Sequence, residues 1–207
     1  INYLKKYFNI ITIDLPHHGN SMNYSDTLDI KNIVNNIILI LDNNDIDKIY
    51  LCGLSLGGCI SEYISFFYPN RVEKMILIGV ANGLSNTILE YGFKLFTKIS
   101  YLIPRSLYLR IFNYLVIPQK NNNNIRKQFY NNAKRMNKVA LINWLKYLST
   151  HFFNYNTYLC EYLNNLNIPK LYIIGKKDYI FYKKVKRSTI TNQYSSLIIL
   201  EKSRSSL

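Results

Sequence analysis

Acidic side chains are scarce in this sequence. The 207 residues include 12 Asp and Glu against 26 Lys and Arg, so the formal net charge is +14. Such a charge is typical of proteins that bind nucleic acid or an anionic membrane surface. However, the chain is also rich in Asn, Ile, Lys and Tyr, the residues that AT-rich codons encode, and it has no nucleic-acid-binding motif. We therefore attribute the charge to compositional bias and expect no nucleic-acid partner.

Cysteines and long apolar runs are also few. Cys52, Cys59 and Cys160 lack the spacing of a disulfide framework, and an odd, sparse set favours reduced thiols in a cytoplasmic protein. We expect Cys52 and Cys59 to be buried and unreactive. No apolar run reaches the ~18 residues of a membrane span, and no signal peptide is recognisable.

The first 83 residues alternate between patterns typical of strands and of helices. We expect strands at 8–13, at 49–52 and at 75–80, the last of them fully buried. A helix capped by Ser25 or Asp26 is expected to run to Leu41, and another to end near Tyr68. Alternation of this kind predicts a parallel sheet with right-handed crossovers, and hence an α/β fold.

The stretch from Gly53 to Gly57 reads G-L-S-L-G and joins a strand to a helix. A serine on such a turn has a strained backbone and presents its hydroxyl outward. We expect Gly53 and Gly57 to let neighbouring backbone pass close by, since they have no Cβ. The N–H of Leu56, at the start of the helix, would be free to stabilise an oxyanion. Ser55 is therefore the candidate nucleophile.

The pattern changes after residue 83. Residues 84–164 show helices rich in aromatic side chains and no convincing strand, and from Tyr91 to Cys160 there is no Asp or Glu. We interpret this segment as an inserted helical lid between two parts of one core, 1–83 and 165–207. Its basic side chains are expected mainly to face water. A second interpretation is that they meet an apolar or anionic substrate, or make a weak contact with a membrane surface.

Four stretches, in order, resemble the α/β-hydrolase superfamily, in its lid-bearing serine esterase, lipase and peptidase-like branch. They are Asp14–Ser21, Gly53–Gly58, Tyr68–Val72 and Gly175–Asp178. The resemblance implies a mostly parallel sheet with helices on both faces and a small-molecule acyl substrate, with no metal or organic cofactor. It assigns Ser55 as nucleophile, Asp178 as the acid that orients a histidine, and the Leu56 N–H as one oxyanion donor.

The sequence departs from the family pattern at both ends. Arg204 and Ser205 stand where the family has Gly and the catalytic His, and the chain has only three histidines, His17, His18 and His151. His17 and His18 match a pocket-lining loop of the family rather than its base. Earlier strands and a second oxyanion loop are also missing. The strand at 8–13 must therefore pair directly with the strand at 49–52, or else leave a gap in the sheet.

We accordingly expect a serine hydrolase of a carboxylic ester, thioester or small amide. We expect its activity to be impaired in this chain, which would be either a fragment or a decayed relative of such an enzyme. The apolar lid favours a medium-chain acyl or aromatic substrate. The alternative is a non-catalytic relative that binds a hydrophobic ligand or partner. The oligomeric state does not follow from the sequence.

Overall fold

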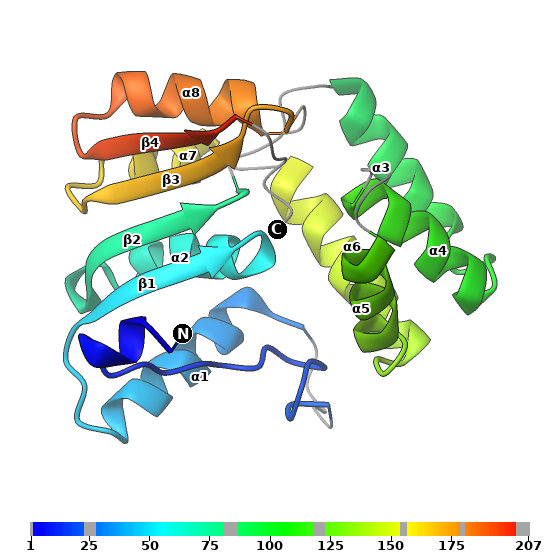
Figure 1. The fold of residues 1–207 in the computed structure, drawn as a ribbon, viewed down its shortest axis with the longest axis horizontal. Helices are drawn as coiled ribbons and strands as arrows, with labels where there is room; N and C mark the ends of the chain where they lie inside the picture. Colours follow the sequence, from blue (N-terminus) through cyan, green and yellow to red (C-terminus); the bar gives the residue numbers. More distant parts are fainter. Residues whose placement is uncertain are drawn as a thin grey trace.

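A four-stranded parallel sheet forms the centre of the fold, as the alternating pattern predicted (Figure 1). The computed structural model describes residues 2–22, 28–80, 87–117, 123–153, 157–178 and 181–201. The strands lie in sequence order and every neighbouring pair is parallel. They are β1 (Ile49–Leu54), β2 (Val72–Ile78), β3 (Lys170–Gly175) and β4 (Ser195–Leu200).

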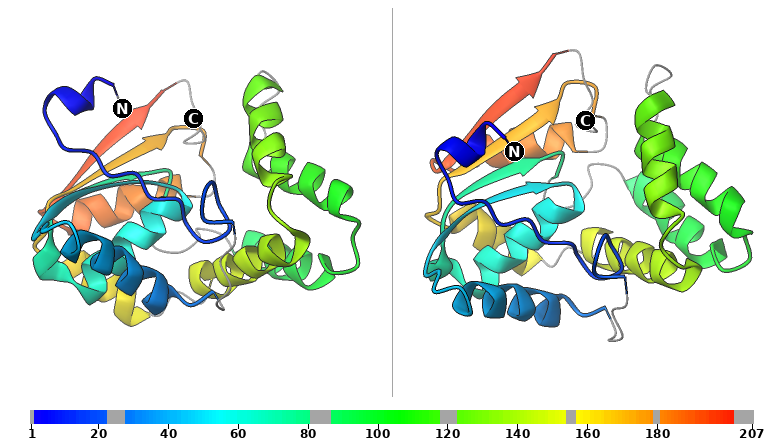
Figure 2. Two further views of the ribbon diagram at one scale, coloured as in Figure 1. Left: turned by 90° about the horizontal axis from the view of Figure 1, so that it is seen from below. Right: turned by 60° about the horizontal axis from the view of Figure 1, so that its bottom comes forward.

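The core helices cover one face of this sheet (Figure 2). They are α1 (Ile30–Asp42), α2 (Leu56–Phe67), α7 (Thr157–Asn165) and α8 (Tyr182–Thr191). Strands that follow sequence order and are joined by right-handed crossovers place every connecting helix on the same side. The predicted parallel sheet with helices packed around it is thus confirmed, and the four helices named here share one side of it.

Side chains on the two faces of the sheet are buried very differently. Leu77 and Ile174 face the helices and are 0% and 1% exposed. Side chains alternate along a strand, and on the opposite face Tyr50, Leu54 and Ile76 are 54%, 47% and 37% exposed. The strand predicted at 75–80 is therefore buried on one side only, and β2 ends at Ile78.

The prediction of a strand at residues 8–13 is wrong. After a short 3-10 helix η1 (Leu4–Lys6), these residues run beside β1 without joining the sheet, and β1 is an edge strand (Figure 1). Phe8 lies against Tyr50, with ring centroids 5.9 Å apart, yet it is half exposed. An apolar run becomes a strand only when a neighbour satisfies its backbone groups, so the second alternative, a gap in the sheet, describes this edge.

The cap of α1 also differs from the prediction. Asp29 is the N-cap, and its carboxylate accepts a hydrogen bond from the Asn32 N–H at 3.2 Å. Ser25 and Asp26, the predicted caps, lie outside the described residues. An aspartate at this position satisfies one of the N–H groups that the first turn leaves without a partner.

Four further helices lie beyond the ends of the strands, within the predicted lid (Figure 1). They are α3 (Thr87–Ile99), α4 (Arg105–Val116), α5 (Asn123–Ala133) and α6 (Lys138–Phe153). Trp144 of α6 ties the lid to the core, because its indole N–H donates to the Pro16 carbonyl at 2.9 Å. In the part of the chain that the structure describes, no helix is both long and apolar enough to cross a bilayer.

Helix α7 packs with the core, although the sequence analysis placed its residues in the lid. The ring of Tyr162 meets that of Phe66 in α2 edge to face, with centroids 5.0 Å apart, and Leu163 is buried in the main core. Lys170 at the start of β3 is buried too, and its ammonium donates to the carbonyls of Leu163 and Leu166 at the end of α7. Burial lowers the pKa of Lys170 to about 8.

Arg71 holds the turn between α1 and β1. It belongs to η2 (Pro69–Arg71), and its guanidinium donates to the carbonyls of Ile46 and Asp47 at 2.6 and 2.5 Å. It also forms an ion pair with Asp42 at 2.7 Å, but half of the Asp42 side chain is exposed. The hydrogen bonds to the turn should therefore matter more for stability than the ion pair.

We predict that Arg71→Gln lowers the free energy of unfolding by about 2 to 3 kcal/mol, because two charged hydrogen bonds to carbonyls are lost. Asp42→Asn should cost about 1 kcal/mol or less, as exposed ion pairs do. Urea unfolding followed by circular dichroism measures both. Equal losses in the two variants would contradict this ranking.

Candidate active site

Ser55 sits on a strained turn between β1 and α2. Its φ is +49° and its ψ is −112°, a conformation that costs a non-glycine residue about 1 to 3 kcal/mol. The Ser55 N–H donates to the Ile78 carbonyl at the end of β2, at 2.8 Å. Its carbonyl accepts the Cys59 N–H at 3.1 Å. The backbone is thus fixed from both sides, while the residue is exposed.

The glycines around the turn have different tasks. A Cβ at Gly53 would lie 2.4 Å from the carbonyl group of Gly57, so strand and helix approach this closely only with glycine at 53. A Cβ at Gly57 would meet no atom of the described residues within 4 Å, so the steric reason predicted for Gly57 does not hold. Gly58 has the second tight contact, since its Cβ would lie 2.6 Å from Cγ1 of Val80. The sequence analysis did not single out Gly58, because no local pattern reveals its contact with Val80, two residues beyond the end of β2.

Leu56 is the first residue of α2. Its N–H therefore has no acceptor within the helix. The N-terminal end of a helix also carries a partial positive charge. The position predicted for an oxyanion donor is thus present at the turn.

Asp178 follows β3 in a tight turn. It is 9% exposed, and its carboxylate accepts the Phe181 N–H at 2.9 Å. Its own N–H donates to the Gly175 carbonyl at 2.9 Å, and its carbonyl accepts the Tyr182 N–H at 3.1 Å. These contacts lead the chain from β3 into α8, so Asp178 has a structural task at this site.

Ser55 and Asp178 lie at the same edge of the sheet. They follow the C-terminal ends of β1 and β3, and β2 lies between these strands. Leu54 pairs with Ile78, which pairs with Ile173, so the two strands are in register there. Two strand spacings separate β1 from β3 by about 10 Å. The sheet therefore brings both predicted residues to one end of the core.

A compact loop carries His17 and His18. The Asp14 carboxylate accepts the Asn20 N–H at 2.9 Å, and the Ser21 hydroxyl donates to the Asp14 carbonyl at 2.9 Å. Gly19 has a φ of +47°, and a Cβ there would lie 2.2 Å from the Asp14 carboxylate. The motif from Asp14 to Ser21 is therefore explained by the turn that it forms.

The rings of both histidines contact their own loop. Nδ1 of His18 is 3.0 Å from the Pro16 carbonyl, and its ring meets Trp144 edge to face at 5.7 Å. Nδ1 of His17 is 3.4 Å from the Met22 carbonyl. None of these contacts brings a histidine to Ser55. The side chain of His151, and residues 202–207 with Arg204 and Ser205, lie outside what the structure describes.

The two cysteines beside the turn differ in exposure. Cys59 is buried, and burial raises the pKa of its thiol well above the usual value, with Glu62 adding to the effect. Cys52 is exposed, contrary to the prediction, because it lies on the uncovered face of β1. Partial burial still raises the pKa of the Cys52 thiol. Among the described residues, no three His, Cys, Asp or Glu side chains gather as a metal site would require.

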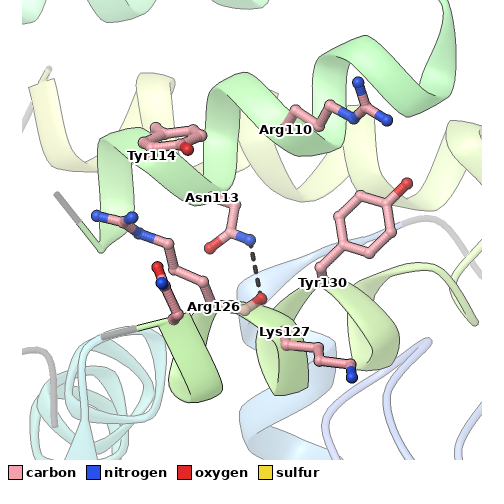
Figure 3. A pocket seen from close by; sticks show the side chains of 7 residues that line it. Arg110, Asn113, Tyr114, Arg126, Lys127 and Tyr130 are labelled. Atoms are coloured by element: carbon pink, nitrogen blue, oxygen red, sulfur yellow. Dashed lines mark hydrogen bonds between the residues drawn. The ribbon is translucent and has the colours of Figure 1, made fainter. Parts of the chain in front are cut away.

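Two hollows lie away from Ser55 and Asp178. The larger has a volume of about 350 Å³ and lies between α4 and α5 of the lid (Figure 3). The smaller, of about 210 Å³, is lined by Ile13, Pro16 and Ile37 among others, between the N-terminal segment and α1.

Comparison with known proteins identifies relatives of this chain. A family model described as alpha/beta hydrolase fold matches residues 1–190. A pimeloyl-[acyl-carrier protein] methyl ester esterase of Wigglesworthia glossinidia brevipalpis is 26% identical over 194 residues, which cover 88% of this chain and 69% of that enzyme. The acetyltransferase component of an acetoin cleaving system from Pseudomonas putida is 35% identical over 79 residues, which cover 38% of this chain and 21% of that protein.

Solved structures share the fold. MenH from S. aureus has a TM-score of 0.79 at 19% identity, with 99% of this chain and 80% of that chain covered. The enol-lactonase from Burkholderia xenovorans LB400 has a TM-score of 0.75 at 14% identity, with 99% and 77% covered. At these identities the likeness concerns the fold alone.

We predict opposite effects of alanine at the two glycines that flank Ser55. Gly53→Ala should lower the free energy of unfolding by about 1 to 3 kcal/mol or more, because its methyl group would overlap backbone atoms. Gly57→Ala should leave stability unchanged or raise it by up to about 1 kcal/mol, since alanine favours the helix. Thermal and urea unfolding of the two variants provide the test. A loss at Gly57→Ala as large as at Gly53→Ala would show that our account of the turn is incorrect.

Proposed function

Because the chain belongs to the alpha/beta hydrolase fold family, we propose that it is a serine hydrolase of carboxylic esters with Ser55 as the nucleophile. Thioesters and small amides would react by the same chemistry. Substrate binding and the geometry of the turn at Ser55 would supply part of the rate enhancement. A group that accepts the proton of the Ser55 hydroxyl must supply the rest.

The conformation of Ser55 is the observation that carries this proposal. The fold does not need serine at this position, because glycine adopts a positive φ at lower cost. Its side chain does not cap α2 either. A strained, exposed serine without a structural task is what a nucleophile on a strand-to-helix turn requires. Strain at such a residue supports a functional role.

Neighbouring groups fit the roles that the mechanism needs. The Ser55 hydroxyl attacks the ester carbonyl, and its proton passes to a base and then to the leaving alcohol. The N–H of Leu56 stabilises the negative charge that develops on the carbonyl oxygen. Water then hydrolyses the acyl-enzyme. Asp178 follows the second strand along, at the same end of the sheet, and would orient a base between itself and Ser55.

The group that would act as the base of this site is not identified. The family resemblance assigns it to the position where this chain has Ser205. His17 and His18 contact carbonyls of their own loop instead. Loss of one member of a triad typically lowers kcat by ~10⁴ to 10⁶. We therefore propose slow turnover, with both the formation and the hydrolysis of the acyl-enzyme slowed by the lack of an efficient base.

The relatives favour an ester as the substrate. One of them, 26% identical to this chain, is named a methyl ester esterase, and that name refers to a carboxylic ester bond. The many aromatic residues in the segment 84–164 favour an apolar acyl group. A second candidate function follows from the histidine contacts: the same fold would bind a hydrophobic ligand without turning it over.

We predict that a fluorophosphonate probe labels the wild-type chain slowly and that Ser55→Ala abolishes the labelling, since the probe reacts with a serine that acts as a nucleophile. Mass spectrometry of the labelled peptide gives the site. If a folded wild-type sample takes up no probe, the serine mechanism fails and binding without turnover is the better account.

We further predict that hydrolysis of p-nitrophenyl esters depends on acyl-chain length, with a maximum at medium chains. An apolar lid gains roughly 0.8 kcal/mol per buried CH₂, so kcat/KM should rise severalfold over the first additions. Ser55→Ala serves as the blank at every length. A flat profile would contradict the role proposed for the lid.

A further inference from the structure

Helix α3 turns one side away from the rest of the lid. On its inward side Phe96 and Thr97 are buried, and the Phe96 ring stacks on that of Tyr108 in α4, with centroids 5.4 Å apart. Residues spaced by three or four positions share one side of a helix. The outward side, here called the outer α3 face, consists of Tyr91, Leu95, Lys98, Ile99 and Leu102.

The outer α3 face is apolar where a helix in water normally carries polar side chains. Tyr91 and Leu95 are 70% and 60% exposed. Leu102 lies in the turn that continues the helix, where its N–H donates to the Ile99 carbonyl at 3.0 Å. At 86% it is the most exposed large apolar side chain among the described residues. A contiguous group of this kind, bordered by polar residues, marks an interaction site.

Basic side chains border this face where α3 ends. The Lys138 ammonium donates to the Tyr101 carbonyl at 2.8 Å, and the Arg105 guanidinium donates to the carbonyls of Lys134 and Met136. These bonds hold the turn between α3 and α4 against the segment between α5 and α6. The exposed cations of the face and of this corner are Lys98, Lys134 and Arg135.

The charge around the outer α3 face has one sign. The sequence has no Asp or Glu from residue 91 to residue 160. A second copy of the chain would bring the same cations to the face, and like charges oppose such contacts. The charge therefore favours an anionic partner. Leucine and tyrosine on one surface with lysine and arginine around them are typical of elements that lie in the interface of an anionic bilayer.

We propose that the outer α3 face, with the basic corner beside it, is a docking surface for an anionic lipid bilayer. Leu95 and Leu102 would enter the boundary between headgroups and acyl chains. Lys98 and Lys134 would keep their ammonium groups at the lipid phosphates, since long side chains reach the interface in this way. Docking does not involve Ser55 and is measured without hydrolysis, so the inference stands apart from the proposed function.

Flotation of the full chain with vesicles tests this surface. We expect binding to vesicles of equal parts phosphatidylcholine and phosphatidylglycerol, none to pure phosphatidylcholine, and release at high salt. The double variant Lys98→Gln/Lys134→Gln should bind at least ~10-fold more weakly, because each basic residue near an anionic surface contributes about fivefold. Both side chains are exposed, so the variant should fold normally.

A matched control removes the same charge from the core. Lys186→Gln/Arg187→Gln changes two exposed cations of α8, which packs on the sheet and not in the lid (Figure 1). This variant should bind the vesicles about twofold more weakly or less, because screening confines the effect of a charge to its surroundings.

The apolar part of the surface has its own test. Leu102→Ser should weaken vesicle binding ~10-fold, as expected for a leucine that leaves water. Ile190→Ser is the control: Ile190 is 76% exposed near the end of α8, at the end of the sheet away from the lid, and should have no effect. Brominated acyl chains should quench the emission of Leu102→Trp and not that of Ile190→Trp. The native Trp144, which is buried, gives the background signal.

Several results would overturn the inference. They are the absence of binding to the anionic vesicles, equal losses in the two double variants, which would indicate attraction by net charge alone, and unquenched emission of Leu102→Trp on bound protein. Two further measurements would then name another occupant. A dimer in sedimentation velocity that Leu102→Ser dissociates would assign the face to a second copy. Binding of polyglutamate that Lys98→Gln/Lys134→Gln abolishes would assign it to an acidic protein.

Discussion

The close approach of β1 to α2 is the constraint on which the rest of the candidate site depends. A Cβ at Gly53 would overlap the backbone at Gly57, and one at Gly58 would overlap Val80. Because neither Gly53 nor Gly58 has a Cβ, the chain can turn within one residue, and Ser55 adopts a positive φ. The Ser55 N–H then reaches the Ile78 carbonyl, which fixes the turn to β2. Since β2 pairs with β3, the same contact sets Ser55 relative to the strand that precedes Asp178.

Local patterns sufficed where local structure decides the outcome. The strand from Ile49, the turn at Ser55 and the helix after it were predicted because apolar periodicity and glycines lie within one short stretch. The segment at 8–13 has an equally good strand pattern, but a strand also needs a neighbour, and the sheet offers it none. The exposure of Cys52 and Tyr50 has a similar origin, because a sequence pattern does not reveal which face of a strand a helix will cover.

Contacts between distant residues account for most of what the sequence did not reveal. The bond from Trp144 to Pro16 joins residues 128 apart and seats α6 on the loop of His17 and His18. In this arrangement the His18 ring packs against the lid. The outward side of α3 likewise becomes evident only when Phe96 is seen to stack on Tyr108 of α4. The charge count indicated a basic lid, but it did not indicate that cations border an exposed apolar face.

Ser55 and Asp178 carry different weight as signs of catalysis. Asp178 accepts the Phe181 N–H and closes the turn into α8. The carboxylate therefore has a structural contact that would be present even in a chain that catalyses nothing. Ser55, in contrast, destabilises the fold. Its backbone conformation costs about 1 to 3 kcal/mol, and its side chain does not cap α2. For stability alone, glycine would serve better at this turn. Serine at position 55 is thus the feature that the fold does not explain, and this is the reason for proposing a chemical role for its hydroxyl.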